Sequence, residues 1–282
     1  MLARASCGSV KLTRVGESMA SERLLGLLAE VQLAAGIRLE DVSSACAGLS
    51  GISIDELRNW ADRLLCAVMP NARVLLCGDE QIALDAAFHG GPGILVVGGT
   101  GSNVVGRCGD GRRFTAGGWG AAVGDEGSGY WIGAQALRAT FHALDRGVET
   151  TLLASIGSAW GLAGPGEIVA YANTQPWPDF SALTPLIVRA AEAGDAVAKA
   201  VLAHAGQALA EQVKVVWERM QAAGEQTAQV AYTGSVLEWI APVRQAMIAA
   251  LPPGLAAMDA PAMAMEGAMW LARNPSGTRD KL

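Results

Sequence analysis

Apolar and polar positions along the chain form short segments that predict strands and helices in alternation. Apolar runs bounded by glycine or turn residues predict strands, and apolar residues at helical spacing predict the helices between them. The predicted strands are 41–49, 73–77, 94–97 and 230–232, and the predicted helices are 22–35, 53–68, 133–145, 183–193, 196–220 and 238–251. Such alternation favours an α/β fold over two segregated halves.

Local signals refine the ends of these elements. Ser53 followed three residues later by Glu56 predicts a capping box at the start of the helix 53–68. Segment 162–185 is the richest in proline and aromatic residues and predicts a loop or cover, and 276–282 predicts a frayed tail. Without a repeat or a low-complexity linker, we expect any domain boundary to be tight and near 90–93.

Composition narrows the class of protein. The 282 residues are 51% apolar, which is ample for a buried core, and the formal net charge is −6. This charge, with no dense basic patch, argues against a nucleic-acid partner. No apolar run approaches the roughly 18 residues of a transmembrane helix, and the N-terminus lacks the apolar core of a secretory signal. We therefore expect a cytoplasmic protein without a membrane partner.

Cysteine and histidine do not predict a metal centre. The five cysteines are widely spaced, with no C-x-x-C pair, and read as reduced, mostly buried thiols. The three histidines are scattered without metal-ligand spacing. The cysteines are Cys7, Cys46, Cys66, Cys77 and Cys108, and the histidines are His89, His142 and His204.

The stretch 93–133 carries the candidate chemistry. Its sequence is GILVVGGTGSNVVGRCGDGRRFTAGGWGAAVGDEGSGYWIG, an apolar strand followed by two glycine-rich turns. In the first turn, backbone amides together with the Thr100 and Ser102 hydroxyls suit a phosphate or a sugar hydroxyl. The second turn adds Trp119, Asp125 and Glu126. These features predict a polar site in an apolar protein.

Each candidate also has a structural interpretation. Asp79 follows the strand 73–77, where open α/β sheets place ligand-contacting groups, but it could equally cap the next helix. Trp119 could pack in the core, and Glu126 could be a charge at a helix start. Asp125, if buried, needs donors or a ligand, because an unpaired buried carboxylate is costly.

Several blocks together resemble the N-acetylglucosamine kinase branch of the BadF/BadG/BcrA/BcrD ATPase family, in the actin, sugar kinase and Hsp70 superfamily. The blocks occur in the family's order and cover nearly the whole chain. They are ACAGLSG at 45–51, CGDEQIAL at 77–84, GTGSN at 99–103, GGWG at 117–120, GDEGSGYWIG at 124–133, AEAGDAVAKAVL at 191–202 and TGSVLEWI at 233–240.

The resemblance implies two ribonuclease-H-like α/β domains facing each other across a cleft. We expect a domain of residues 1–91 and another of residues 92–275, with the last helix able to pack back on the first. The implied activity is phosphorylation of an amino sugar by ATP with Mg²⁺, most simply N-acetylglucosamine to its 6-phosphate. A homodimer is compatible with it.

The resemblance also assigns residues to roles. Asp79 matches the general base, whose carboxylate takes the proton of the attacking sugar hydroxyl. The positions that match sugar-binding residues are Ser50, Asn103, Gly118, Trp119, Gly120 and Asp125. The positions that match the nucleotide side are Thr100, Gly101, Gly194, Gly234 and Ser235. It assigns no metal ligand among the residues present.

One feature departs from the family pattern. Family members begin with a strand and a DGGGT-type turn that wraps the ATP phosphates, whereas this sequence starts at MLARASCGSVKL. A start codon placed too far downstream and a truncated homologue are the two explanations. Three functions therefore stay open: an amino-sugar kinase, a sugar-binding module without catalysis, and an activator ATPase of a radical dehydratase, whose iron–sulfur cluster needs cysteine pairs.

Overall fold

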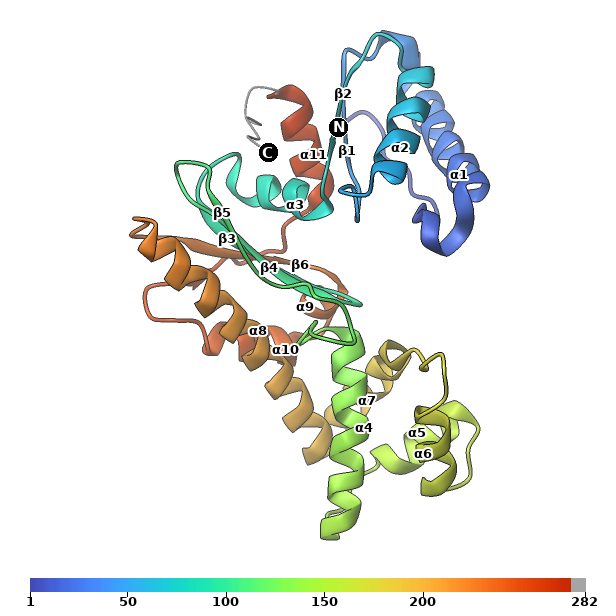
Figure 1. Ribbon diagram of the computed structural model, residues 1–282, viewed down its shortest axis with the longest axis vertical. Helices are drawn as coiled ribbons and strands as arrows, with labels where there is room; N and C mark the ends of the chain where they lie inside the picture. The colour runs from blue at the N-terminus through green and yellow to red at the C-terminus, as the bar shows by residue number, and fades with distance from the viewer. Residues whose placement is uncertain (275–282) are drawn as a thin grey trace. The chain divides into compact units, whose positions relative to one another are not determined.

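The computed structural model describes residues 1–274 and has an α/β fold built of two compact units (Figure 1). Unit 1 contains Met1–Gly90 and the chain from Met263 onward, and unit 2 contains Gly91–Ala262. Within the described residues, none of the helices combines the length and apolar character needed to cross a bilayer. The predicted tail at 276–282 lies outside the described residues.

Unit 1 has three layers with a small sheet in the middle. Its elements are α1 (Leu12–Ala35), the 3₁₀ turn η1 (Leu39–Asp41), β1 (Ser44–Gly48), α2 (Asp55–Val68), β2 (Arg73–Cys77), α3 (Asp79–Phe88) and α11 (Ala264–Arg273). Strands β1 and β2 are parallel. Leu76 faces the cluster that α1 and α2 build around Trp60, whereas Leu75 and Cys77 face α3 and α11. The strand therefore alternates between two apolar clusters, as strand geometry requires.

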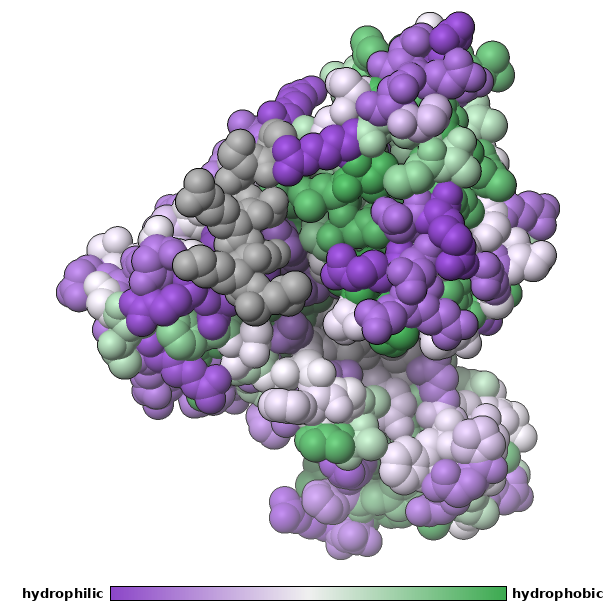
Figure 2. All heavy atoms as spheres, turned by 45° about the horizontal axis from the view of Figure 1, so that its top comes forward, coloured by the Kyte–Doolittle hydropathy of each residue, from purple (hydrophilic) through white to green (hydrophobic). Residues whose placement is uncertain are grey.

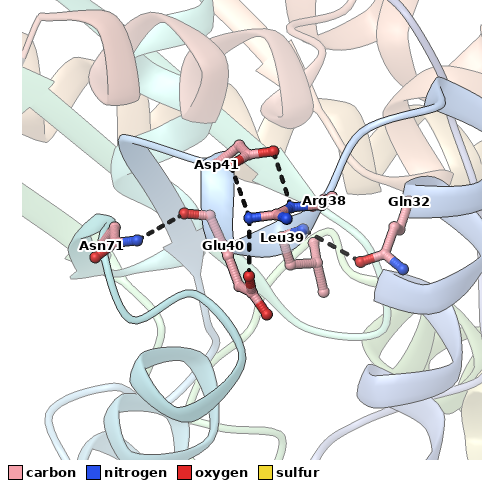
Figure 3. Close-up of polar contacts among 6 residues, drawn as sticks. All are labelled: Gln32, Arg38, Leu39, Glu40, Asp41 and Asn71. Atoms are coloured by element: carbon pink, nitrogen blue, oxygen red, sulfur yellow. Dashed lines mark hydrogen bonds and ion pairs between the residues drawn. The ribbon is translucent and has the colours of Figure 1, made fainter.

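A polar network holds together the connections at the amino end of this sheet (Figure 3). Arg38 forms ion pairs with Glu40 at 3.0 Å and Asp41 at 3.2 Å. The Leu39 amide donates to the side chain of Gln32 at the end of α1, and Asn71 donates to the Glu40 carbonyl. These bonds link the loop that enters β1 to the loop that enters β2, so both parallel strands start in register.

Unit 2 contains a mixed five-stranded sheet. Its strands are β3 (Gly93–Gly98), β4 (Ser102–Arg107), β5 (Arg113–Gly117), β6 (Gln229–Thr233) and β7 (Ala256–Ala257). The strand order is β5-β4-β3-β6-β7, with β3, β4 and β5 antiparallel and β6 parallel to both β3 and β7. Its helices are α4 (Gly129–Arg146), α5 (Leu152–Trp160), α6 (Pro165–Ala172), α7 (Thr184–Glu192), α8 (Ala196–Ala222), α9 (Ser235–Trp239) and α10 (Ala241–Ala249), with a 3₁₀ turn η2 (Phe180–Leu183).

The long helix α8 covers one face of this sheet (Figure 1). Its apolar stripe includes Leu209, Val213 and Val216, all fully buried, and it packs against β3, β4 and β5. Gly106 in β4 allows close approach, because a side chain there would collide with Val216 and Met220. Burial of this stripe removes apolar area from water and so stabilises the unit.

The pattern of apolar positions predicted several elements closely. Strand 73–77 is β2 as predicted, helix 196–220 is α8 extended by two residues, and helix 133–145 is the greater part of α4. The predicted α/β class is therefore confirmed. The predicted helix 22–35 is longer, because α1 begins at Leu12 and passes through Gly16 with a non-helical backbone.

Other predictions about elements were wrong. The capping box is absent, since α2 begins at Asp55 and its N-cap, Ile54, makes no side-chain cap bond. Segment 162–185 is not a continuous loop, because it contains α6 and η2, and the alternative that it forms a cover stays a prediction. The predicted helix 238–251 is two helices, α9 and α10, that meet at Ile240 just before Pro242. The thiols are not mostly buried either: Cys7 and Cys66 are exposed.

The strands of unit 1 are less deeply buried than the central strands of unit 2. All five residues of β1 are only half-buried, whereas β3 is buried at five of its six positions. Figure 2 shows apolar side chains gathered on the surface in the upper part of the view, over unit 1. The sheet of unit 1 is therefore less completely covered than the sheet of unit 2.

Candidate functional site

The turn between β3 and β4 presents free backbone amides. The Gly99 amide donates to the Gly101 carbonyl at 2.9 Å, and the Gly99 carbonyl accepts from the amide of Gly129, the first residue of α4, at 2.8 Å. Within the described chain, the amides of Thr100 and Gly101 donate to no other residue. The turn is thus anchored at Gly99 and leaves two amide donors without a partner in the described residues, and their contact with an anion stays a prediction.

Asp125 is held in the loop that leads from β5 to α4. Its side chain is only 9% exposed, and Oδ1 accepts a hydrogen bond from the Gly120 amide at 3.2 Å. Its other oxygen, Oδ2, lies over Gly101, where a Cβ atom would approach it to 2.7 Å. Asp125 also has a positive φ of 59°, an uncommon conformation for a non-glycine residue. A buried carboxylate with one protein donor has capacity for a ligand hydroxyl.

Asn103 and Trp119 lie in the same neighbourhood. Asn103 pairs with Gly117 across β4 and β5, and Gly118 lies against its amide group. Its Oδ1 atom is buried without a hydrogen-bond partner in the described residues, and such atoms call for an explanation such as a ligand or an ordered water. Trp119 is 77% exposed, so the interpretation of this residue as core packing was wrong. Asn103, Gly118, Trp119, Gly120 and Asp125 are therefore brought together.

Helix α8 supports this loop through a residue that lies outside the sequence motifs. Gln212 of α8 is 9% exposed and donates to Glu126 at 3.0 Å, while the Ser102 hydroxyl donates to the Glu126 carbonyl at 2.8 Å. Glu126 therefore connects the loop to Gln212 and Ser102 through hydrogen bonds. It does not cap α4, because Ser128 caps this helix by accepting from the Trp131 amide. A polar residue on the buried stripe of α8 was the only sequence signal for Gln212.

A cavity of about 390 Å³ adjoins the Thr100 turn. Residues of η2, α7, α9 and the neighbouring segments line the cavity. The lining residues most relevant to ligand binding are Thr100, Pro185, Val188, Ser235, Trp239 and Ile240. The volume falls within the range of small-molecule sites, and apolar walls with a few polar groups suit a flat heterocycle. A nucleotide fits this composition: a base between apolar walls, and phosphates toward the free amides of the turn.

The glycines assigned to the nucleotide side differ in position. Ser235 lines the cavity, and Gly234, with φ of 96°, precedes it. A Cβ at Gly234 would lie 2.5 Å from the Gly98 carbonyl oxygen, so packing against β3 explains this glycine. Gly194 lies between α7 and α8 and is not one of the residues that line the cavity. Its contact with a nucleotide stays a prediction.

Ser50 and Asp79 lie in unit 1, at the carboxyl ends of β1 and β2. The two parallel strands end at the same edge, since Gly48 pairs with Cys77 and the Leu49 amide donates to the Cys77 carbonyl. Both residues are exposed. Gly78 is the N-cap of α3 and Asp79 is the first residue of the helix. The interpretation of Asp79 as the helix cap was therefore wrong. Its Oδ1 atom accepts only from the Glu80 amide, at 3.2 Å.

The fold defines the class of protein. The fold is similar to that of a glucokinase of the ROK family from Streptomyces griseus, at a TM-score of 0.52, with 91% of this chain and 88% of that chain covered. Their sequence identity is 16%, so this likeness concerns the fold alone. The chain has the fold of the actin-like ATPases and sugar kinases.

The family follows from the sequence match. Residues 1–268 match the model of the BadF/BadG/BcrA/BcrD ATPase family, and the chain belongs to this family. It is similar to a candidate N-acetylglucosamine kinase of known structure from Chromobacterium violaceum, with 30% identity, a TM-score of 0.68, and 96% of this chain and 90% of that chain covered.

A curated relative is similar over a shorter span. The N-acetylmuramic acid/N-acetylglucosamine kinase of Clostridium acetobutylicum is 32% identical over 186 residues, which is 65% of this chain. The match spans 61% of the length of that relative. The predicted family is confirmed by these comparisons.

Proposed function

We propose that this protein transfers the γ-phosphoryl group of ATP to an amino sugar, with N-acetylglucosamine as substrate and its 6-phosphate as product. The observation that carries the proposal is the cavity of unit 2, with apolar walls and two free amides at the Thr100 turn. N-acetylglucosamine is the substrate that the names of the two similar kinases share. We further propose that units 1 and 2 are the two domains of the kinase fold.

Sugar recognition would rest on the loop from Gly117 to Ser128. Asp125 has one oxygen bonded to Gly120 and another available, and Asn103 has a buried acceptor without a partner in the described residues. Both are acceptors for sugar hydroxyl or amide hydrogens, and the exposed ring of Trp119 offers a flat apolar face. Ser50 would add a hydroxyl from unit 1. The hydrogen-bond acceptors would set the orientation of the sugar, and the Trp119 ring would provide apolar contact area.

Different residues would bind the nucleotide and act as the general base. The free amides of Thr100 and Gly101 would bind phosphate oxygens, with Ser235 near the nucleoside and Gly194 and Gly234 as further predicted contacts. Asp79 would take the proton from the sugar hydroxyl as that oxygen attacks phosphorus. Its carboxylate is exposed and makes a single local bond, so it can rotate toward a substrate.

Magnesium would accompany the nucleotide. In kinases Mg²⁺ binds mainly to phosphate oxygens and waters, with one or two carboxylates, and it neutralises charge on the transferring group. Residues 1–274 contain no group of three or more His, Cys, Asp or Glu side chains placed to hold a metal. The residues present are thus compatible with a metal brought by ATP, and we assign none of them as a ligand.

An assay of ADP release with MgATP and N-acetylglucosamine tests the proposal. Sugar-dependent release is expected, and Asp79→Asn should lower it by about 10²–10⁴-fold. Asp55→Asn is the matched control, because Asp55 is likewise the exposed first residue of a helix in unit 1. Glucosamine and N-acetylmuramic acid should be compared as alternative substrates.

The same experiment separates the alternatives. If N-acetylglucosamine raises the melting temperature but releases no ADP, the protein is a sugar-binding module and the kinase proposal fails. ADP release at the same rate with and without the sugar would instead indicate an ATPase.

The proposal also covers the cellular location and the oligomeric state of the protein. We propose that the protein acts in the cytoplasm, where ATP is available, and that it forms a homodimer. Exposed apolar side chains on unit 2, among them Val169, Tyr171 and Trp177, offer contact area. Sedimentation at several concentrations would reveal a monomer if the dimer proposal is wrong.

A further inference from the structure

Two cysteines far apart in sequence meet inside unit 1. Cys46 of β1 and Cys77 of β2 face the same side of the sheet, toward α3 and α11, and their sulfur atoms are 3.8 Å apart. Cys77 is 5% exposed, whereas Cys46 is partly exposed. The role of Asp79 in phosphoryl transfer makes no use of either thiol. The other three cysteines are not hydrogen-bonded to a second cysteine.

The surroundings of the pair distinguish the two thiols. The hydrogen bond between the two thiols lowers the pKa of Cys46, against the opposing effects of burial and the Asp85 carboxylate. The same bond, together with burial and nearby negative charge, raises the pKa of Cys77. Cys46 is therefore the more acidic thiol of the pair and the one that is partly exposed to solvent, and Cys77 is the buried thiol behind it.

We propose that Cys46 and Cys77 form an oxidant-responsive modification site, at which hydrogen peroxide converts the pair into an intramolecular disulfide. The Cys46 thiolate attacks one peroxide oxygen, so that an S–O bond forms, the O–O bond breaks, and hydroxide leaves and is protonated to water. The Cys77 thiol then loses its proton and attacks the Cys46 sulfur, and a second water leaves as the S–S bond forms. Two thiols and one peroxide give one disulfide and two waters.

Strand geometry gives the disulfide a structural consequence. Cys46 pairs with Leu75, two residues before Cys77, and a two-residue offset on neighbouring strands separates Cα atoms by roughly 8 Å. Disulfides require about 4.4–6.8 Å, so closure must move a strand end by more than about 1 Å. Cys77 is the last residue of β2 and is followed by Gly78 and Asp79. Closure would therefore shift the segment that carries Asp79, and the strained bond should be easily reduced.

Peptide mapping tests the proposal without reference to catalysis. The full chain carrying Cys7→Ser and Cys66→Ser, which removes both exposed thiols, is treated with hydrogen peroxide, alkylated and digested with trypsin without reduction. The expected product joins peptide 39–58 to peptide 74–107, and dithiothreitol releases it. Cys108, a buried thiol on the separate peptide 108–112, is the internal control and should react at least about tenfold more slowly.

A Cys46→Ser variant in the same background sharpens the test. It should leave Cys77 unmodified under the same treatment, with a circular dichroism melt showing that the variant is folded. Cys46→Ala serves if the serine variant does not fold. Sulfinic acid on Cys46 without cross-linked peptide, a cross-link between two chains, or unreacted Cys46 in the folded protein would each overturn the proposal.

Activity supplies a second readout, which rests on the proposed kinase function. The oxidised protein should release ADP more slowly than the reduced protein, and dithiothreitol should restore the rate. If the protein is not a kinase, no ADP release occurs in either state, while the cross-linked peptide still forms.

Discussion

Asp79 and Asp125 show two different ways of holding a carboxylate. Asp79 lies at the end of a two-stranded sheet that is only half-buried, is exposed, and accepts one bond from the next amide along the chain. Asp125 is buried, has a positive φ, and is held by the Gly120 amide beside the turn between β3 and β4. The first carboxylate is free to move and the second is preorganised. Under the proposed function, Asp79 would accept a proton and Asp125 would orient the sugar, and these two roles call for different environments.

The largest expected effect comes from the support beneath the preorganised loop. Leu209 is fully buried and packs directly under Gly127, in the loop that carries Asp125. Leu209→Ala should lower the free energy of unfolding by about 2–5 kcal/mol, through lost burial and the cavity left behind. Leu57→Ala in unit 1, at a residue that is 9% exposed, is the matched change and should cost less. Urea unfolding measures both, and equal losses would contradict the contrast between the units.

The next largest effect on stability is expected at Gly234, the glycine that allows the end of β6 to approach β3 closely. Gly234→Ala should cost about 2–4 kcal/mol, because the residue has φ of 96° and its Cβ would meet the Gly98 carbonyl at 2.5 Å. Gly147→Ala is the control: φ is 63° and nothing lies within 4 Å of the added atom, so only about 1 kcal/mol should be lost. Thermal unfolding of both variants decides whether the close approach or the dihedral angle dominates.

A pH-dependent effect is expected at the N-terminus of α8. Desolvation would raise the pKa of Asp195, but hydrogen bonds from the Ala198 and Thr151 amides and the Thr150 and Thr151 hydroxyls outweigh it and lower the pKa. The stabilisation by this carboxylate is therefore present above its unfolded pKa and is lost as pH falls through the lower folded value. Asp195→Ala should cost about 1–2 kcal/mol at neutral pH.

Measurement across pH checks this assignment. The difference in unfolding free energy between the parent and Asp195→Ala should shrink below about pH 4. A difference that stays constant to pH 2 would show that the ionised carboxylate is not the source.

The smallest expected effect on stability is at Asp79. Asp79→Asn should change the free energy of unfolding by less than about 0.5 kcal/mol, because the side chain is exposed and makes one local bond. Asp125→Asn should cost more, about 1–2 kcal/mol, since it weakens a charged acceptor for a buried amide. Calorimetry of the two variants tests the comparison directly, and a larger loss at Asp79 would reverse it.

The local pattern of residues determined the elements whose periodicity is strong. Strand 73–77 and helix 196–220 carry continuous or evenly spaced apolar residues, and the structure reproduces both. The pattern did not predict β4 and β5, because glycines and charges interrupt their apolar positions, and pairing with β3 supplies what local propensity lacks. It also missed the break at Ile240, where Pro242 starts a new helix.

The motifs located the candidate loops, and tertiary structure decided how their residues are held. Asn103, Gly120 and Asp125 are close enough in sequence for the motif to group them, but the bond from Gln212 to Glu126 depends on α8, which lies 86 residues further along the chain at that point. Sequence gave no reason to place Gly234 against Gly98, or Cys46 against Cys77. Local periodicity records which face of an element is buried, whereas contacts between distant segments arise only when those faces pack together.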